Sequence, residues 1–457
     1  MSATTPGPVV PTGLPGRVLR GYALGGVATG SFGTVPGLML LPYLTERLGV
    51  PAALAGVIVF APKAWDVILN PIAGRISDRS QHPDGPRRPF LLRGGLTLAV
   101  AFALLFAGPA SPQALAAGWV AVLFLACATA YAFFQVPYVA MPAELTDSAR
   151  ERTRIMSWRV AVLALAILIS GGLAPMVRTM VGPERGYAAM GLFVAVLIAL
   201  GAVGAWWGTR GAPTRAVVAA PGGLRSQLAL VAGNPDFRAL ILTFITQALA
   251  TGAMLAGVDY IARQVLHSAG AGSVLFVCFV APAIVCTPLW ERLAARRGKR
   301  WAYAAASLVL SAGAFALVAA RVIPALVVYL AVAVVGVGYA GAQMLPLSML
   351  PDVAAGDAAD SGENRIGVFT GVWTAGETLG MAFGPFVYGL VLAAGGYVSS
   401  TDSAAVQPDS AVTAIVLGFS LVPALLTLGS LLFLRGYVGP IPRGFASYGP
   451  AGEEDRR

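Results

Sequence analysis

Twelve long apolar stretches run through this chain, and they constrain its fold more than any other feature of the sequence. Only 11% of the 457 residues are charged, whereas 57% are hydrophobic. Ordinary soluble domains contain about 25% charged residues, so this chain has too little charge to cover soluble domains of its size. The high hydrophobic content also excludes intrinsic disorder. We therefore expect an all-α membrane protein that crosses the bilayer many times.

Each stretch has close to the ~20 apolar residues that a helix needs to cross the hydrocarbon core. Glycine and proline inside the stretches are compatible with this, because neighbouring helices can satisfy the freed backbone groups. The expected spans are Gly21–Leu44, Ala52–Ile76, Leu91–Ala110, Leu115–Val139, Ser157–Val177, Tyr187–Trp207, Phe237–Val258, Gly270–Leu293, Trp301–Ala320, Pro324–Leu347, Val368–Ala393 and Val412–Leu434.

The distribution of basic residues predicts the orientation of these spans. If the N-terminus is cytoplasmic, 25 of the 31 Lys and Arg residues lie in inner loops, inner tails or adjoining span ends. Five lie in outer loops, and Lys63 lies inside a span. Because cytoplasmic loops are enriched in Lys and Arg, we expect both termini in the cytoplasm. The same enrichment explains the net charge of +10, so nucleic acid is not an expected partner.

The chain is expected to consist of two six-helix halves. The first half covers residues 1–207 and the second covers residues 237–457, the latter with a short cytoplasmic tail. Residues 208–236 form the longest inner loop, rich in Gly, Pro, Ala and Arg, and are interpreted as a cytoplasmic linker.

The two halves share a weak internal repeat. Val136-Pro137 and Pro142 lie around the end of the fourth span, and Leu345-Pro346 and Pro351 lie around the end of the tenth, with the same five-residue proline spacing. Two acidic residues follow each pair of prolines, Glu144 and Asp147 in the first half and Asp352 and Asp357 in the second. Internal symmetry of this kind is typical of secondary transporters.

Charged residues recur in the inner loops at matching positions of the halves. Gly74-Arg75-Ile76-Ser77-Asp78-Arg79, followed by Gly85-Pro86-Arg87-Arg88-Pro89, resembles the cytoplasmic signature of the major facilitator superfamily. Such charges can pair with neighbouring helices and their ends, and so form a latch that opens as the halves move. They could also serve only to set the topology. The residues expected in this cytoplasmic gate are Asp78, Arg79, Arg87, Arg88, Glu144, Arg152, Glu291 and Arg292.

Three further stretches narrow the resemblance. They are Gly21-Tyr22-Ala23-Leu24-Gly25-Gly26, Lys63-Ala64-Trp65-Asp66-Val67-Ile68-Leu69-Asn70-Pro71, and Val136-Pro137-Tyr138 with the Glu144-Leu145-Thr146-Asp147 that follows. Together they resemble the glycoside–pentoside–hexuronide:cation symporter family of the major facilitator superfamily. The resemblance implies the major facilitator fold, in which two pseudo-symmetric six-helix halves enclose one cavity, and coupled transport by alternating access.

The sequence departs from that family at four positions. Gly26 and Asn70 stand where the family usually has acidic residues, and Gln135 stands where its best-known member has one. The lysine that the family carries in the eleventh span is absent, and Glu377 lies at or beside its position. A galactoside substrate and sodium coupling therefore do not follow from the resemblance.

Ionisable residues inside the spans are the candidate coupling groups, because a charge at the bilayer centre costs about 2.5–3.5 kcal/mol on insertion scales. Lys63, Asp66 and Asn70 are three and four residues apart, so they share one helix face and Lys63 can neutralise Asp66. The resemblance places the family's cation site on these positions, with Gln135 as a neighbour. Glu377 has no basic residue within one turn and is expected to be a second titrating group. Alternatively, each group could only stabilise helix packing.

Five other side chains are expected to line the substrate cavity. Tyr22 and Tyr138 follow family positions, Gln247 and Gln343 offer both donors and acceptors, and Trp373 could stack on a sugar or an apolar solute. Each could instead be a packing residue.

The remaining polar residues indicate no enzyme. Asp259 and Arg263, four residues apart, are interpreted as an outer-side ion pair rather than as a binding site. No catalytic triad, phosphate loop or metal cluster is visible in the sequence.

These residues together predict a secondary active transporter. We expect symport of a small solute, a sugar or glycoside, with Asp66 as the coupling carboxylate and with H⁺ favoured over Na⁺, because one acid remains in the second span. No cofactor or metal is expected. The partners are the small-molecule substrate and the lipid bilayer, and the chain is expected to act as a monomer. High Arg, Ala and Gly usage indicates a GC-rich genome, and we expect the protein in the inner membrane of a bacterium.

Two other functions remain open at this stage. A proton-coupled exporter of drugs or amphipathic lipids fits the missing carboxylate at Gly26 and the apolar spans. A non-transporting membrane sensor or scaffold is more distant, because the 22 residues after Arg435 are too few for a soluble domain.

Overall fold

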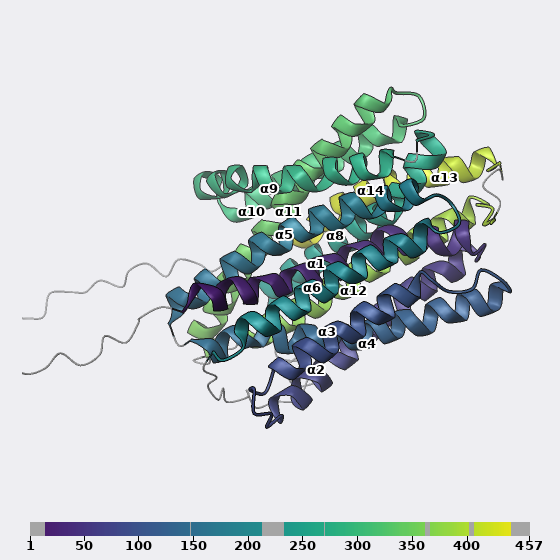
Figure 1. The fold of residues 1–457 in the computed structure, drawn as a ribbon. Coiled ribbons are helices and arrows are strands. Elements are labelled where there is room, and N and C mark those ends of the chain that lie inside the picture. Colours follow the sequence, from purple (N-terminus) through teal and green to yellow (C-terminus); the bar gives the residue numbers. More distant parts are fainter. Residues whose placement is uncertain are drawn as a thin grey trace, which may run out of the picture.

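The computed structural model describes residues 14–146, 148–212, 233–268, 270–361, 366–401 and 406–439. Within these ranges the chain forms a bundle of helices and contains no strand (Figure 1). Twelve segments of the described chain are long and apolar enough to cross a membrane. The expected all-helical fold with twelve spans is therefore confirmed.

The first six spans contain seven helical elements. They are α1 (Gly16–Pro42), η1 (Tyr43–Arg47), α2 (Ala52–Asp78), α3 (Arg88–Leu105), α4 (Gln113–Leu145), α5 (Ala149–Val181) and α6 (Gly186–Thr209). Most of the expected linker at 208–236 lies outside the described residues. The last six spans contain α8 (Pro235–Tyr260), η2 (Ile261–Val265), α9 (Ala271–Arg297), α10 (Lys299–Ala316), η3 (Leu317–Ala319), α11 (Ala325–Ser361), α12 (Ile366–Ala394), α13 (Asp409–Phe419) and α14 (Leu421–Leu434).

Several helices are longer than the apolar stretches that predicted them. α11 continues from the expected end at Leu347 to Ser361, and α5 begins at Ala149 instead of Ser157. Apolar length measures only the part of a helix that the hydrocarbon core covers. The backbone hydrogen bonds continue into the polar ends, which hydropathy does not detect.

The last span is interrupted, although the sequence predicted one helix over Val412–Leu434. α13 ends at Phe419 and α14 begins at Leu421, with Ser420 between them at φ −118° and ψ −71°. Pro423 explains the break, because it has no N–H for the Phe419 carbonyl and its ring clashes with that group.

The helix contacts repeat in the two halves. In the first half α1 packs on α5 and α6, and in the second half α8 packs on α12 and α14. α3 packs on α4 and α6, as α10 packs on α11 and α14. Between the halves, α2 lies against α12 and α9 against α5, which are matching pairs. α1 and α8 both end in a five-residue π-helical turn. The halves are therefore pseudo-symmetric.

Both ends of the described chain lie at the same end of the bundle. Thr45 and Tyr260, which lie where α1 and α8 end, are in contact, so these two helices run parallel. The backbone N–H of Val438 donates to Asp236, at the start of α8, over 2.8 Å. Val438 and the start of α1 therefore lie at the same end of the bundle, and α2 also ends there. We call it the Asp78 end, and the opposite end of the bundle the Glu46 end.

Candidate functional site

A cavity of about 1090 Å³ lies between the two halves. α1, α2, α4 and α5 line it from the first half, and α8, α9, α11 and α12 line it from the second. Its lining includes Asn70, Val139 and Gly367, which lie on the parts of α2, α4 and α12 nearest the Asp78 end. The cavity therefore extends towards the Asp78 end of the bundle.

The five residues predicted for cation coupling all line this one cavity. Lys63, Asp66 and Asn70 reach it from α2, because their spacing places them on one face of the helix. Gln135 reaches it from α4, and Glu377 faces it from α12 in the other half. The fold thus brings together groups from both halves that are far apart in the sequence.

Lys63 does not form the ion pair with Asp66 that the sequence predicted. Its Nζ lies 4.4 Å from the ring centroid of Phe32, and 5.9 and 5.7 Å from those of Phe124 and Tyr131. Asp66 is 3% exposed, and its Oδ1 has no hydrogen-bond partner in the described structure. The expected pairing is corrected because three aromatic rings from α1 and α4 attract the ammonium group instead.

Two polar contacts complete the cavity wall. The Thr29 hydroxyl donates to Gln135 Oε1 over 2.7 Å, and Gln343 Nε2 donates to the Tyr339 hydroxyl over 2.8 Å. All four residues line the cavity, so Gln343 lies where it was expected. Thr29 and Tyr339 carry no charge, and nothing in the sequence distinguishes them from packing residues.

Tyr22 and Tyr138 do not line the cavity, and this prediction is corrected. Both are fully buried between α1 and α4, with ring centroids 4.6 Å apart. The Tyr22 hydroxyl donates to the Tyr138 carbonyl over 3.1 Å, and the Tyr138 hydroxyl donates to the Tyr22 carbonyl over 2.9 Å. Because each hydroxyl satisfies the other residue's backbone, the pair joins the two helices.

Gln247 and Trp373 also lie outside the cavity lining, against expectation. Gln247 Nε2 donates to the hydroxyls of Ser307 and Ser430, each over 2.9 Å, inside the second half. Trp373 is 1% exposed and stacks on Phe244 with ring centroids 4.2 Å apart. Both side chains face a helix interface, where they stabilise packing.

Replacing Tyr138 with Phe tests the structural role of the tyrosine pair. The change removes the side-chain hydrogen bond to the buried Tyr22 carbonyl, which keeps its bond within α1, at an expected cost of about 0.5–1.5 kcal/mol. We expect a lower midpoint of thermal unfolding in detergent and an unchanged KM for transport. The cavity residue Tyr131, changed to Phe, is the matched control and should leave the midpoint almost unaltered. An unchanged midpoint with a raised KM for Tyr138→Phe would contradict the assignment.

Charges at the Asp78 end form a cluster within the first half. Arg87 Nη2 lies 2.8 Å from Asp78 Oδ1, and Arg87 Nε also pairs with Glu144. The cluster joins the end of α2, the start of α3 and the end of α4. These three gate residues therefore meet, as the sequence predicted.

Two other predicted gate residues bind backbone groups. Arg88 donates to the carbonyl oxygens of Asp84 and Ala212. Arg152 Nε donates to the Thr146 carbonyl over 2.9 Å. Arg88 and Arg152 therefore both bind segments that connect or follow helices of the first half.

Arg79, Glu291 and Arg292 do not join the cluster. All three are exposed, and none forms an ion pair with another residue in the described part of the chain. Lys299 and Asp352 provide the ion pair of the second half instead, with Nζ and Oδ2 2.6 Å apart. The expectation for Glu291 and Arg292 is corrected because α9 continues regularly to Arg297 and leaves them facing outwards.

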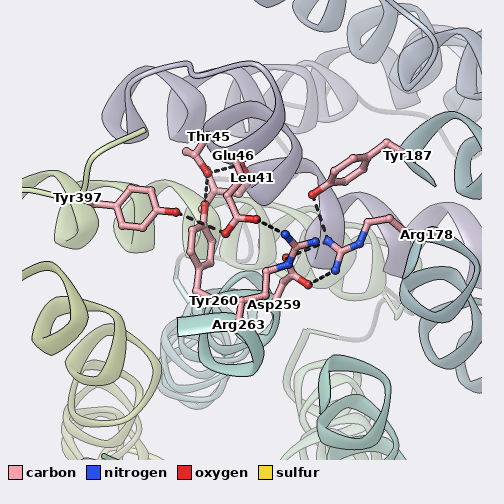
Figure 2. Close-up of polar contacts among 9 residues, drawn as sticks. All are labelled: Leu41, Thr45, Glu46, Arg178, Tyr187, Asp259, Tyr260, Arg263 and Tyr397. Carbon is pink, nitrogen blue, oxygen red and sulfur yellow. Dashed lines mark hydrogen bonds and ion pairs between the residues drawn. The ribbon is translucent and has the colours of Figure 1, made fainter. Parts of the chain in front are cut away.

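At the Glu46 end, a largely buried charge cluster joins the two halves (Figure 2). Arg178 of α5 contacts Asp259 of α8 through two bonds, Nη1 to Oδ2 at 2.9 Å and Nη2 to Oδ1 at 2.6 Å. Arg263 of η2 lies 3.1 Å from Asp259 and 3.0 Å from Glu46 of η1. We call these four residues the inter-half cluster. Each half contributes one acid and one base, so the cluster is neutral.

Hydroxyl groups surround the inter-half cluster (Figure 2). Arg178 Nη1 donates to the Tyr187 hydroxyl over 3.1 Å, and the Tyr397 hydroxyl donates to Glu46 Oε1 over 3.4 Å. Burial and the nearby Glu46 carboxylate raise the pKa of the Tyr397 hydroxyl, so it stays protonated and remains a donor. The hydroxyls of Thr45 and Tyr260 lie 2.6 Å apart and add a second bond between the halves.

The predicted ion pair of Asp259 and Arg263 is confirmed, but it is part of this larger cluster. Glu46 and Arg178 come from other spans, and no spacing in the sequence connects them to α8. α2 and α12 also approach closely at the Glu46 end, where a Cβ on Gly389 would lie 2.6 Å from the Ala52 carbonyl oxygen. The cavity is therefore closed towards this end.

The chain resembles known transporters in sequence and in structure. An uncharacterised symporter of Synechocystis is 26% identical over 88% of this chain and 90% of its own. The mouse sphingosine-1-phosphate transporter MFSD2B is 25% identical over 73% of this chain and 71% of its own. A bacterial homologue of the lysosomal transporter Spinster, solved facing inward and occupied, superposes with a TM-score of 0.69 at 12% identity, covering 92% of this chain and 94% of that one.

The family model described as MFS/sugar transport protein matches residues 21–438, which is most of the chain. This match agrees with the symporter resemblance of the sequence, and the structural similarity shows the major facilitator fold. The chain belongs to the MFS/sugar transport protein family and is a membrane transporter, not an enzyme.

Proposed function

We propose that this transporter couples the movement of a cation to the symport of a small solute by alternating access. The observation that carries the proposal is the meeting of Lys63, Asp66 and Glu377 in one cavity between the halves. Ionisable groups are costly inside a membrane, so their convergence in a cavity indicates a transport site. The similarity to a protein named as a symporter supports coupled transport.

Asp66 is the proposed coupling carboxylate. Its Oδ1 lacks a hydrogen-bond donor, and the nearby Lys63 ammonium lies over aromatic rings. A bound cation would therefore offset the cost of the buried carboxylate. We favour H⁺ over Na⁺, because Asn70 and Gln135 are neutral and Gln135 Oε1 already accepts a bond from Thr29. A proton needs only an oxygen of the Asp66 carboxylate as its binding site.

The inter-half cluster is the proposed gate on the outer side. The positive-inside distribution of Arg and Lys supports a cytoplasmic Asp78 end, and with this orientation the cavity opens inward. Outward opening requires Arg178 to leave Asp259, and Arg263 to leave Glu46. Asp259 can keep Arg263, four residues along the same helix, so separation does not leave either half with a net charge.

The proposed solute is a small hydroxylated molecule such as a sugar or glycoside. Amides and hydroxyls from both halves can bind such a solute, and the family model describes sugar transport. The hydroxyl groups on the cavity wall belong to Thr29, Thr34, Tyr131, Thr251, Tyr339, Thr370, Thr374 and Thr378.

A second candidate solute class is an amphipathic lipid. The rings of Phe124, Phe276 and Phe279 line the same cavity and could contact an acyl chain. The similarity to a transporter named for sphingosine-1-phosphate favours this alternative.

With either class of solute, both walls of the cavity come from one chain, so we propose that the protein acts as a monomer. We propose a bacterial cell membrane as its location.

Uptake into proteoliposomes under imposed gradients tests the proposed function. Labelled sugars, glycosides and lysolipids are supplied separately, with a pH gradient, a sodium gradient or neither. We expect accumulation of a sugar or glycoside above its equilibrium level when the outside is acidic. Accumulation driven by sodium alone would overturn the proton assignment, and gradient-independent equilibration of every solute would overturn coupling. Transport of lysolipids alone would favour the second solute class.

A further inference from the structure

The cavity wall carries more acidic than basic groups. Among its described lining residues, Asp66 and Glu377 are acidic and Lys63 is basic. We propose that the cavity selects solutes that carry an ammonium group, with Glu377 as the residue that binds it. This proposal rests on the proposed transport function and names its substrate class: a small amine with apolar or hydroxylated parts.

Glu377 has a free carboxylate in the described structure. It forms no ion pair and accepts no hydrogen bond from a described residue, although it lies only partly exposed in the middle of α12. A carboxylate removed from bulk water needs a donor, preferably a charged one. Since the described residues supply none, an ammonium group of the solute would meet that need.

The wall next to Glu377 is rich in acceptors. The Thr374 hydroxyl donates to the Thr370 carbonyl over 3.0 Å, and the Thr378 hydroxyl donates to the Thr374 carbonyl over 2.9 Å. Each hydroxyl therefore uses its one hydrogen on its own helix and offers lone pairs to the cavity. An ammonium group has three donors and no acceptor, so it matches this wall better than a hydroxyl or a carboxylate does.

The second half contributes aromatic rings to the cavity wall, opposite the first half that carries Lys63. Phe279 and Tyr339 have ring centroids 4.8 Å apart, and both line the cavity together with Phe276. The faces of such rings attract cations. The first half already shows this chemistry, because its rings hold the Lys63 ammonium at 4.4 Å from the centroid of Phe32.

An anionic solute fits this wall poorly. Lys63 is the only basic side chain among the described lining residues, and an anion could use it only by drawing it away from its rings. The same anion would also face the like charge of the Glu377 carboxylate. Solutes that carry a carboxylate or phosphate group and no ammonium group are therefore expected to bind poorly.

Equilibrium binding to the purified full-length protein tests this proposal with two matched sets of probes. Glucosamine, glucose and glucuronate share a ring, and octylamine, octanol and octanoate share a chain. We expect the amine of at least one set to bind about tenfold or more tightly than its neutral and anionic partners, as a charge-assisted hydrogen bond implies. Glu377→Gln should remove this preference, Glu377→Asp should keep part of it, and the exposed control Glu291→Gln should leave it unchanged.

Three results would overturn the proposal: tighter binding of a neutral or anionic member, no binding of either amine, or an unchanged preference in Glu377→Gln. Because the measurement uses no gradient, it is independent of coupling. Loss of gradient-driven uptake together with a retained amine preference would overturn the proposed symport alone.

Discussion

Asp66→Asn is expected to abolish uphill accumulation of the solute while leaving solute exchange across the membrane intact. Asn has almost the shape of Asp but cannot take up and release a proton, so the cavity keeps its form and loses its coupling group. The accumulation ratio should fall to about 1, because a carrier without coupling only equilibrates its solute. Gradient-driven uptake and counterflow, measured in the same proteoliposomes, separate these two activities.

The control for Asp66→Asn is the same substitution at an exposed ion pair. Asp409 is 92% exposed and lies 2.8 Å from Arg321, and surface pairs of this kind contribute little. Asp409→Asn should therefore accumulate solute as the unchanged protein does. Accumulation well above equilibrium by Asp66→Asn would show that another group couples transport.

Asp259→Asn is expected to open the Glu46 end of the transporter. The substitution leaves Arg178 without its carboxylate and leaves Arg263 with Glu46 alone, and breaking a buried ion pair costs about 3–5 kcal/mol. This free-energy cost applies to the closed arrangement, in which the charges of the two halves are in contact. It does not apply once the halves have separated at that end. A shift of this size changes a two-state population by about 100-fold or more.

Thiol labelling from the Glu46 side measures this opening. The three free cysteines, Cys127, Cys278 and Cys286, are first replaced by Ala, and Ala382 in the cavity wall is changed to Cys. A membrane-impermeant maleimide should then react at least tenfold faster when Asp259→Asn is added.

A second substitution distinguishes loss of the lock from general damage. Adding Arg178→Gln to Asp259→Asn removes one unpaired charge, so labelling should be slower in the double variant than in Asp259→Asn alone. Asp409→Asn again serves as the control and should label as slowly as the starting protein. Equal labelling of Asp259→Asn and the starting protein would contradict a gating role for the inter-half cluster.

The number of spans and the shared position of Lys63, Asp66 and Asn70 on the cavity wall could be predicted because each depends on local sequence. Apolar length identifies a span, and the spacing of Lys63, Asp66 and Asn70 places them on one face of a single helix. Their partners could not be predicted, because Phe32 and Tyr131 come from other spans. For the same reason, Glu46 and Arg178 could not be linked to the ion pair of Asp259 with Arg263.

Buried polar side chains were the least predictable part of the site. Tyr22, Tyr138, Gln247 and Trp373 are polar or aromatic residues inside spans, which is equally typical of a cavity wall and of a helix interface. Their directions depend on how the helices rotate against each other. Only contacts between helices, such as the paired bonds of Tyr22 and Tyr138, distinguish the two cases.

The central claim is that solute movement carries a cation through Asp66. It is tested most directly by adding solute to lightly buffered, de-energised proteoliposomes and recording the external pH. We predict transient alkalinisation with the unchanged protein, because protons enter with the solute, and no pH change with Asp66→Asn. Solute entry without any movement of protons or sodium, or the same alkalinisation in both proteins, would contradict the claim.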